Sequence, residues 1–163
     1  MLFLGVMLAN DSTTNRPPGP TARRLGRGRP RQCHTVFVVD DYEATREAIV
    51  TMLQTKGFDA VGAASGPEAL DRFQAGFRPC VVLLDIHMPV MDGWEVWERM
   101  KGHPEVAELP VVILSADPAD DARAVAVGIR EFLRKPIDGA ALVEAVERHC
   151  ERHTLRAPDL IAS

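Results

Sequence analysis

Five side chains that could do chemistry stand at the ends of short apolar runs in this 163-residue chain. They are Asp40, Asp41, Asp85, Ser115 and Lys135. If the fold brings the three carboxylates to one place, they repel one another and stay ionised together only where a cation joins them. A small cluster of oxygen ligands suits Mg²⁺, which keeps several of its waters when it binds to protein. Lys135 offers a second, compact cation.

A carboxylate between a hard metal ion and an ammonium group is well placed to accept a phosphoryl group. The metal and Lys135 would neutralise charge on the phosphoryl oxygens, and Ser115 would hydrogen-bond one of them. The residue types therefore predict aspartyl-phosphate chemistry with Mg²⁺ as cofactor. Taken singly, Asp41 and Asp117 have a simpler interpretation, because an Asp at a strand-to-helix turn commonly caps the helix.

The elements that must position these residues alternate along the chain. Apolar runs predict strands at 36–39, 80–84 and 109–114, and two weaker or shorter segments, 58–63 and 129–133, are also predicted as strands. Helical spacing and capping residues predict helices at 42–56, 65–76, 92–101, 117–127 and 138–153. Such alternation requires crossover connections and gives an α/β fold, an open, doubly wound parallel sheet with helices on both faces. Functional side chains of this fold class gather at the carboxyl ends of the strands.

Four segments carry a resemblance to a known family. They are Val38-Val39-Asp40-Asp41, Leu84-Asp85-Ile86-His87-Met88-Pro89-Val90-Met91-Asp92-Gly93, Leu114-Ser115-Ala116 and Phe132-Leu133-Arg134-Lys135-Pro136. In this order and spacing they resemble the receiver domain of bacterial response regulators, over about residues 33–153. The resemblance implies a flavodoxin-like five-stranded sheet of order 2-1-3-4-5.

The resemblance also implies a role for each matching residue. Asp85 matches the phosphoacceptor, while Asp40 and Asp41 match the acidic pair that holds Mg²⁺ together with Asp85. His87 would offer its backbone carbonyl to the metal. Lys135 matches the lysine of the site.

Three further positions follow from the same resemblance. Ser115 matches the hydroxyl that turns toward the phosphoryl group, and Phe132 matches the switch aromatic, which is more often Tyr or His. A Phe has no hydroxyl, so coupling through it would rest on packing. Pro136 matches a proline that follows a cis peptide bond.

The function expected from the resemblance is that of a stand-alone, single-domain response regulator, a signalling phosphoacceptor rather than an enzyme, which assists its own phosphorylation and dephosphorylation. A sensor histidine kinase or a histidine phosphotransfer protein would supply the phosphoryl group to Asp85. The output would be binding of a downstream protein through the face made by the fourth helix, fifth strand and fifth helix, with homodimer formation open as well. Two alternatives stay open: a phosphate shuttle in a multistep phosphorelay, and an interaction module that uses the receiver fold without phosphorylation.

Charge and composition divide the chain. Residues 1–33 hold six arginines against one acid, a net charge of +5, which leaves −9 for the rest of a chain of net charge −4. We expect 1–32 to be a disordered basic tail rich in Pro, Gly and Arg, 33–153 the receiver domain and 154–163 a C-terminal tail. The acidic domain excludes a broadly basic nucleic-acid binder, and no DNA-binding domain is expected. No apolar run is long enough for a membrane span.

The three cysteines are Cys33, Cys80 and Cys150. Their number is odd and none stands in a C-x-x-C pair, so their spacing predicts neither a disulfide framework nor a zinc site. Cys80 opens an apolar run and is expected in the core. These features favour a reducing compartment, hence a cytoplasmic location.

Overall fold

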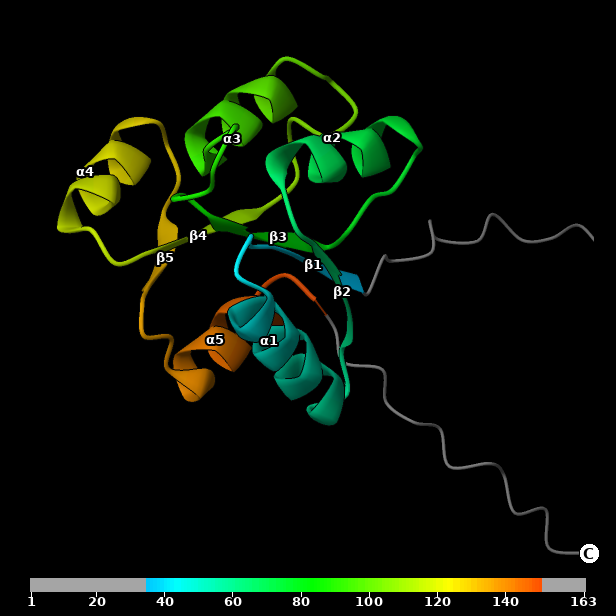
Figure 1. Ribbon diagram of the computed structural model, residues 1–163, viewed down its shortest axis with the longest axis vertical. Coiled ribbons are helices and arrows are strands. Elements are labelled where there is room, and N and C mark those ends of the chain that lie inside the picture. Colours follow the sequence, from blue (N-terminus) through cyan, green and yellow to red (C-terminus); the bar gives the residue numbers. More distant parts are fainter. Residues whose placement is uncertain (1–34, 151–163) are drawn as a thin grey trace, which may run out of the picture. The chain divides into compact units, whose positions relative to one another are not determined.

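The computed structural model describes residues 35–150, and within them five strands alternate with five helices (Figure 1). The elements are β1 Thr35–Val39, α1 Glu43–Thr55, β2 Asp59–Ala63, α2 Gly66–Gln74, β3 Val81–Asp85, α3 Gly93–Lys101, β4 Val111–Ser115, α4 Pro118–Ala126, β5 Glu131–Arg134 and α5 Gly139–Glu147. All ten predicted elements are present, and their ends differ by at most two residues except in α5, which was predicted to reach about His153 and ends at Glu147. The predicted tails, 1–32 and 154–163, lie outside the described residues. The basic residues of the N-terminal tail lie there too.

The strands form one parallel sheet of order β2-β1-β3-β4-β5, which confirms the flavodoxin-like topology. In the register, Val38 lies opposite Leu83, and Leu84 lies opposite Ile113. Figure 1 shows α1 and α5 on one face of the sheet and α2, α3 and α4 on the other. The carboxyl ends of all five strands therefore lie at one edge.

Two apolar clusters hold the helices to the two faces of the sheet. Phe37 and Val39 face the cluster under α2, α3 and α4, and Val36 and Val38 face the cluster under α1 and α5. Neither set of side chains reaches solvent, which explains why the strands appear in the sequence as unbroken apolar runs. Each large apolar side chain buried in this way stabilises the fold by about 1.5–3 kcal/mol.

Side-chain caps begin four of the five helices. Ser65, Asp92, Asp117 and Asp138 each accept a hydrogen bond from a backbone amide in the first turn of α2, α3, α4 and α5. The expected cap at Asp117 is thus confirmed, with Oδ1 accepting from the Ala119 amide at 2.9 Å. Asp41 is different, because the capping position of α1 belongs to Tyr42 and carries no side-chain cap. The interpretation of Asp41 as a helix cap is therefore wrong.

The cysteine prediction is also wrong for one pair. Cys80, just before β3, and Cys150, just after α5, form a disulfide with their Cα atoms 5.6 Å apart. The two residues are 70 positions apart in the sequence, and only the packing of α5 beside the start of β3 brings them together. The spacing of the cysteines in the sequence therefore gave no sign of this disulfide. Cysteine spacing no longer supports the expected reducing compartment.

Among residues 35–150, no helix has both the length and the apolar character needed to cross a bilayer.

Candidate functional site

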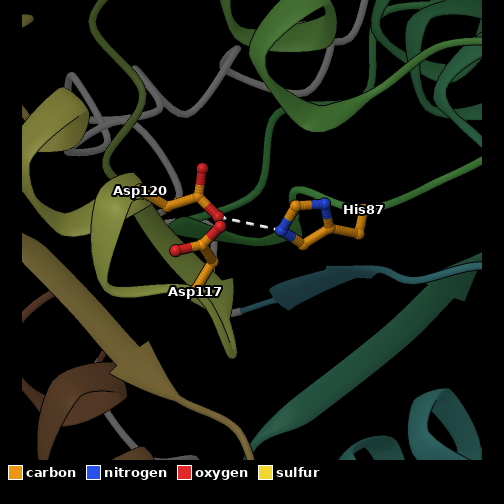
Figure 2. Close-up of side chains that lie close together, drawn as sticks. All are labelled: His87, Asp117 and Asp120. Atoms are coloured by element: carbon orange, nitrogen blue, oxygen red, sulfur yellow. Dashed lines mark hydrogen bonds and ion pairs between the residues drawn. The ribbon is translucent and has the colours of Figure 1, made fainter.

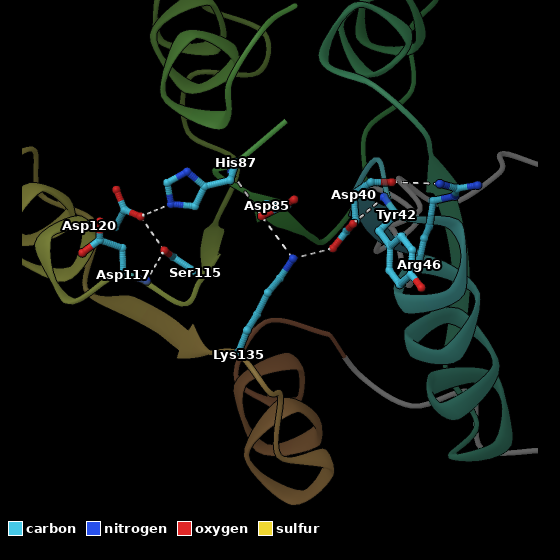
Figure 3. A network of polar contacts seen from close by, with 9 residues as sticks. All are labelled: Asp40, Tyr42, Arg46, Asp85, His87, Ser115, Asp117, Asp120 and Lys135. Carbon is cyan, nitrogen blue, oxygen red and sulfur yellow. Dashed lines mark hydrogen bonds and ion pairs between the residues drawn. The ribbon is translucent and has the colours of Figure 1, made fainter. Parts of the chain in front are cut away.

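Two groups of polar side chains lie at the edge of the sheet where the strands end. One group surrounds Asp120 at the start of α4 (Figure 2), and the other surrounds Lys135 (Figure 3). Asp40 follows β1 directly, and Lys135 follows β5 directly. Asp85 and Ser115 are the last residues of β3 and β4. The parallel register thus brings Asp40, Asp85 and Lys135 together in one group, whereas Ser115 joins the group around Asp120.

The ammonium of Lys135 lies between two buried carboxylates. Its Nζ is 2.9 Å from Oδ2 of Asp40 and 3.2 Å from Oδ1 of Asp85. Asp40 is 0% and Asp85 3% exposed, whereas the Lys135 side chain is 26% exposed. The ammonium therefore closes the site toward β5 and partly neutralises the two carboxylates.

Burial and neighbouring charge set the ionisation of this group. Burial raises the pKa of the Asp85 carboxyl, the charge of Lys135 lowers it in part, and the Asp40 carboxylate raises it further, so that it stays above its usual value. Burial also lowers the pKa of Lys135, but its hydrogen bond to Asp40 and the charge of Asp85 outweigh that effect and leave the pKa raised. The lysine is accordingly protonated at neutral pH, and the site holds more negative than positive charge.

Three carboxylates are arranged to hold a hard metal ion. Oxygen atoms of Asp40, Asp41 and Asp85 all lie within 4.8 Å of one another. Asp41 is exposed while the other two are buried, so the open side of the cluster leaves room for metal-bound water. This all-oxygen donor set with one solvent side, together with the excess negative charge, fits Mg²⁺.

Hydrogen bonds hold Asp40 and Asp85 in position within the carboxylate cluster. Oδ1 of Asp40 accepts a hydrogen bond from the Tyr42 amide at 2.9 Å, and its carbonyl accepts one from Arg46 Nη1, also at 2.9 Å. The His87 amide donates to Oδ1 of Asp85 at 3.2 Å. The loop after β1 and the loop after β3 are thus held against the carboxylates that they carry.

The loop after Asp85 is tightly packed against the start of α3. The Gly93 amide donates to the carbonyl of Ile86 at 2.9 Å. A Cβ on Gly93 would stand 2.3 Å from the backbone oxygen of Asp85 and 2.9 Å from Cα of Ile86. Only glycine permits this approach, and it places Asp85 against the start of α3.

The second group contains residues that the sequence did not single out. Asp120, in the first turn of α4, is 8% exposed. Its Oδ2 accepts from the Ser115 hydroxyl and lies 3.0 Å from Nε2 of His87, and its Oδ1 accepts from the indole Nε1 of Trp94 at 3.1 Å. Figure 3 shows the Ser115 hydroxyl bonded to this carboxylate, apart from the contacts of Lys135 with Asp40 and Asp85.

These contacts determine the charge of Asp120. Burial raises the pKa of its carboxyl, but the hydrogen bonds from Ser115 and Trp94 and the nearby His87 outweigh that effect and lower it. Asp120 is therefore ionised at neutral pH. His87, Asp117 and Asp120 also come within 4.8 Å of one another (Figure 2), but Asp120 is already bonded to three side chains, so we interpret the group as a hydrogen-bond network.

The remaining predicted positions lie at β5. Phe132 is 38% exposed, and the bond between Lys135 and Pro136 is cis, as the resemblance implied. Asp120 and Trp94 were missed because an acid in the first turn of a helix and a tryptophan on an amphipathic helix are both ordinary. No signal in the sequence links residues 26 positions apart.

A first prediction concerns stability without metal. Because the folded pKa of Asp85 is raised, its charge destabilises the fold above that pKa and has no such effect below the unfolded pKa. In EDTA, Asp85→Asn is expected to raise the free energy of unfolding by about 1 kcal/mol at pH 7 and by nothing at pH 3. Urea unfolding measures this free energy, and the exposed Asp71→Asn serves as the control. An Asp85→Asn variant that is less stable than the wild type at pH 7 would contradict the prediction.

Comparisons with known proteins agree with this geometry. The family model described as "Response regulator receiver domain" matches residues 36–147. Protein PilG of Pseudomonas aeruginosa is 31% identical over 121 residues, which cover 73% of this chain and 89% of PilG. The transcriptional regulatory protein CseB of Streptomyces coelicolor is 35% identical over 117 residues, which cover 71% of this chain but 48% of CseB.

Solved structures show the same fold. The chemotaxis protein CheY4 of Vibrio cholerae has a TM-score of 0.65 at 29% identity, over 72% of this chain and 98% of that one. A putative response regulator from Chloroflexus aurantiacus has a TM-score of 0.66 at 29% identity, over 71% of this chain and 96% of that one. The family model covers more than half of the chain, and its span contains Asp40, Asp85, Ser115 and Lys135. The chain belongs to the response regulator receiver family.

Proposed function

We propose that this chain accepts a phosphoryl group on Asp85, with Mg²⁺ held by Asp40, Asp41 and Asp85 and by the backbone carbonyl of His87. The observation that carries the proposal is the position of Lys135, whose ammonium lies within 3.2 Å of both Asp40 and Asp85. A carboxylate that already faces a cation on one side and further carboxylates on the other needs only a divalent ion to complete a phosphoryl-binding site.

In the transfer, an Asp85 oxygen forms a bond to phosphorus as the phosphorus–nitrogen bond of a phosphohistidine breaks. Asp85 attacks as the carboxylate, so no proton has to leave it. The electron pair of the phosphorus–nitrogen bond stays on the imidazole nitrogen, and the ring leaves as neutral imidazole because its other nitrogen carries a proton. Lys135 and the hydroxyl of Ser115 serve the phosphoryl oxygens. Bound Mg²⁺ supplies charge neutralisation for the same oxygens.

The partners of this chemistry are a sensor histidine kinase or a histidine phosphotransfer protein, which donates the phosphoryl group, and a downstream protein. The surface proposed for the latter is the α4–β5–α5 face, where Val125 and Phe132 are exposed. The phosphorylated state would change partner affinity through Ser115 and through packing of Phe132. On this proposal residues 33–153 act as a receiver domain in the cytoplasm.

Labelling by a small phosphodonor tests the proposal. Incubation of the whole chain with acetyl phosphate and Mg²⁺ is expected to add one phosphoryl group, read by intact mass spectrometry, and EDTA is expected to abolish the gain. Asp85→Asn should remove all labelling, because no carboxylate remains at the acceptor position. Asp71→Asn, an exposed acid on α2, should be labelled like the wild type.

The same experiment separates the alternatives. Labelling that persists in Asp85→Asn would overturn the assignment of the acceptor, and no labelling of the wild type with any donor would favour an interaction module that works without phosphorylation. Return of the phosphoryl group from Asp85 to a histidine phosphotransfer protein would instead identify a phosphorelay shuttle.

A further inference from the structure

We propose that Asp120 is a positioning residue that holds the Ser115 hydroxyl away from Asp85 until a phosphoryl group competes for it. The inference rests on the proposed function, since it concerns what happens to Ser115 when Asp85 is modified. It adds to the site a residue on α4, the helix that borders the proposed partner surface.

The hydrogen-bond inventory of Ser115 makes the two states exclusive. A serine hydroxyl has a single proton to donate. The Asp117 amide donates to Ser115 Oγ at 3.0 Å, and the Ser115 hydroxyl donates to Oδ2 of Asp120, so its one proton is directed at Asp120. A phosphoryl oxygen on Asp85 is likewise only an acceptor. Ser115 can therefore serve Asp120 or the phosphoryl group, but not both.

Asp120 remains hydrogen-bonded when Ser115 leaves. Its Oδ1 keeps the indole N–H of Trp94, at 3.1 Å, and its Oδ2 keeps the ring of His87, at 3.0 Å. A buried carboxylate stripped of every donor would be strongly unfavourable, and these two donors, from α3 and from the loop after β3, avoid that outcome. Release of the hydroxyl is accordingly a small step that a phosphoryl group can drive.

The exchange reaches α4 because this helix is lightly anchored. Its buried residues are Asp120 and Ala124, with no large apolar side chain among them. The Ser115–Asp120 hydrogen bond is one of the ties between the start of α4 and the sheet, beside the ion pair of Asp121 with Arg134 of β5. Breaking this bond on phosphorylation loosens the helix. The two states then differ in one named contact, the Ser115–Asp120 hydrogen bond, as a population shift requires.

The test measures how tightly each variant binds beryllium trifluoride, a stable mimic of a phosphoryl group on a carboxylate, in the presence of Mg²⁺. Asp120→Asn keeps the size of the side chain and an acceptor for Trp94 but loses the charge that attracts the Ser115 proton. We expect it to bind the mimic about three- to tenfold more tightly than the wild type, the difference between a charge-assisted and a neutral hydrogen bond. Asp121→Asn, the same charge change one position along α4, is expected to bind within about twofold of wild type.

A second background separates positioning from a structural effect. If Asp120 acts through the Ser115 hydroxyl, then Asp120→Asn must have no effect on binding when Ser115→Ala is already present. A gain that persists with Ser115→Ala, or no gain with Ser115 intact, overturns the inference. A wild type that neither binds the mimic nor is labelled speaks against the proposed function itself and removes the basis of the inference with it.

A measurement on the unaltered carboxylate covers the case in which Asp120→Asn does not fold. The indole N–H resonance of Trp94, identified by comparison with Trp97→Phe, reports on the Asp120 oxygen that it contacts. We expect this resonance to shift on saturation with the mimic, because Asp120 loses one of its three donors. An unchanged resonance in a chain that binds the mimic would also overturn the inference.

Discussion

Lys135→Met is expected to lower the free energy of unfolding at pH 7, in the absence of Mg²⁺, by about 3 kcal/mol. The substitution keeps most of the side-chain volume but leaves two carboxylates, Asp40 and Asp85, buried beside each other without their cation. Breaking a buried ion pair from one side is costly for this reason. We take the low end of the usual range because the Lys135 side chain is 26% exposed and water partly replaces it.

The pH dependence of this loss has a defined sign. The pKa of Lys135 is higher in the folded chain than in the unfolded one, so its stabilisation is complete below the unfolded pKa and disappears as the pH rises through the folded value. The deficit of Lys135→Met should therefore be full at pH 7 and shrink above about pH 10.5. Urea unfolding of the variant and the wild type at pH 7 and above about pH 10.5 measures this deficit in stability.

The exposed lysine at the end of α1 gives a matched control, since Lys56→Met removes the same charge from a position without buried carboxylates and should change stability by less than about 0.5 kcal/mol. Added Mg²⁺ should reduce the deficit of Lys135→Met, because the metal restores positive charge beside Asp40 and Asp85. Equal stability of the Lys135→Met variant and the wild type at pH 7 would refute the role given to the ammonium.

Gly93→Ala is expected to destabilise the fold by about 2–3 kcal/mol and to reduce labelling of Asp85. The new Cβ would meet the backbone oxygen of Asp85 at 2.3 Å, far inside van der Waals contact, and backbone cannot give way by changing a rotamer. Either α3 or the end of β3 must move, and both hold Asp85, the proposed acceptor, in place. Thermal or urea unfolding gives the stability, and the acetyl phosphate assay gives the labelling.

Gly102→Ala is the control for this substitution. Gly102 ends α3 with a φ of −74°, and a Cβ there would approach nothing closer than 3.4 Å. Alanine at such a position usually leaves stability unchanged or raises it by about 0.4–1 kcal/mol. If Gly93→Ala and Gly102→Ala changed the free energy of unfolding equally, the close approach at Gly93 would not contribute to stability.

The strand ends were predictable because the central strands are buried on both faces. Their side chains form unbroken apolar runs, and the polar residue that ends each run marks the edge of the sheet, as Asp40 and Asp85 do. The ends of β5 were predicted less accurately. Ile129 is buried in the cluster under α2, α3 and α4 although it lies before the strand, so the predicted strand begins two residues before the paired segment Glu131–Arg134.

The contacts around Asp120 could not be predicted, for a different reason. Periodicity reports which face of an element is buried, but the contact between Trp94 on α3 and Asp120 on α4 depends on how two helices sit side by side over the sheet. The pairing of Cys80 with Cys150 has the same origin, since it depends on where α5 ends against β3. Such contacts are properties of packing, and a single sequence contains no periodic trace of them.

The light anchoring of α4 has a consequence for local unfolding. Backbone amides in a helix exchange with solvent through openings whose free energy depends on how much apolar surface must be exposed. Helix α3 buries Trp94, Val96 and Met100, whereas α4 buries Asp120 and Ala124 and leaves Val125 exposed. We therefore expect α4 to open while the sheet and α3 stay folded, and its amides to exchange with deuterium well before those of α3. A partner that recognises the α4 surface would then slow this exchange, which makes deuterium uptake in α4 a direct measure of occupancy.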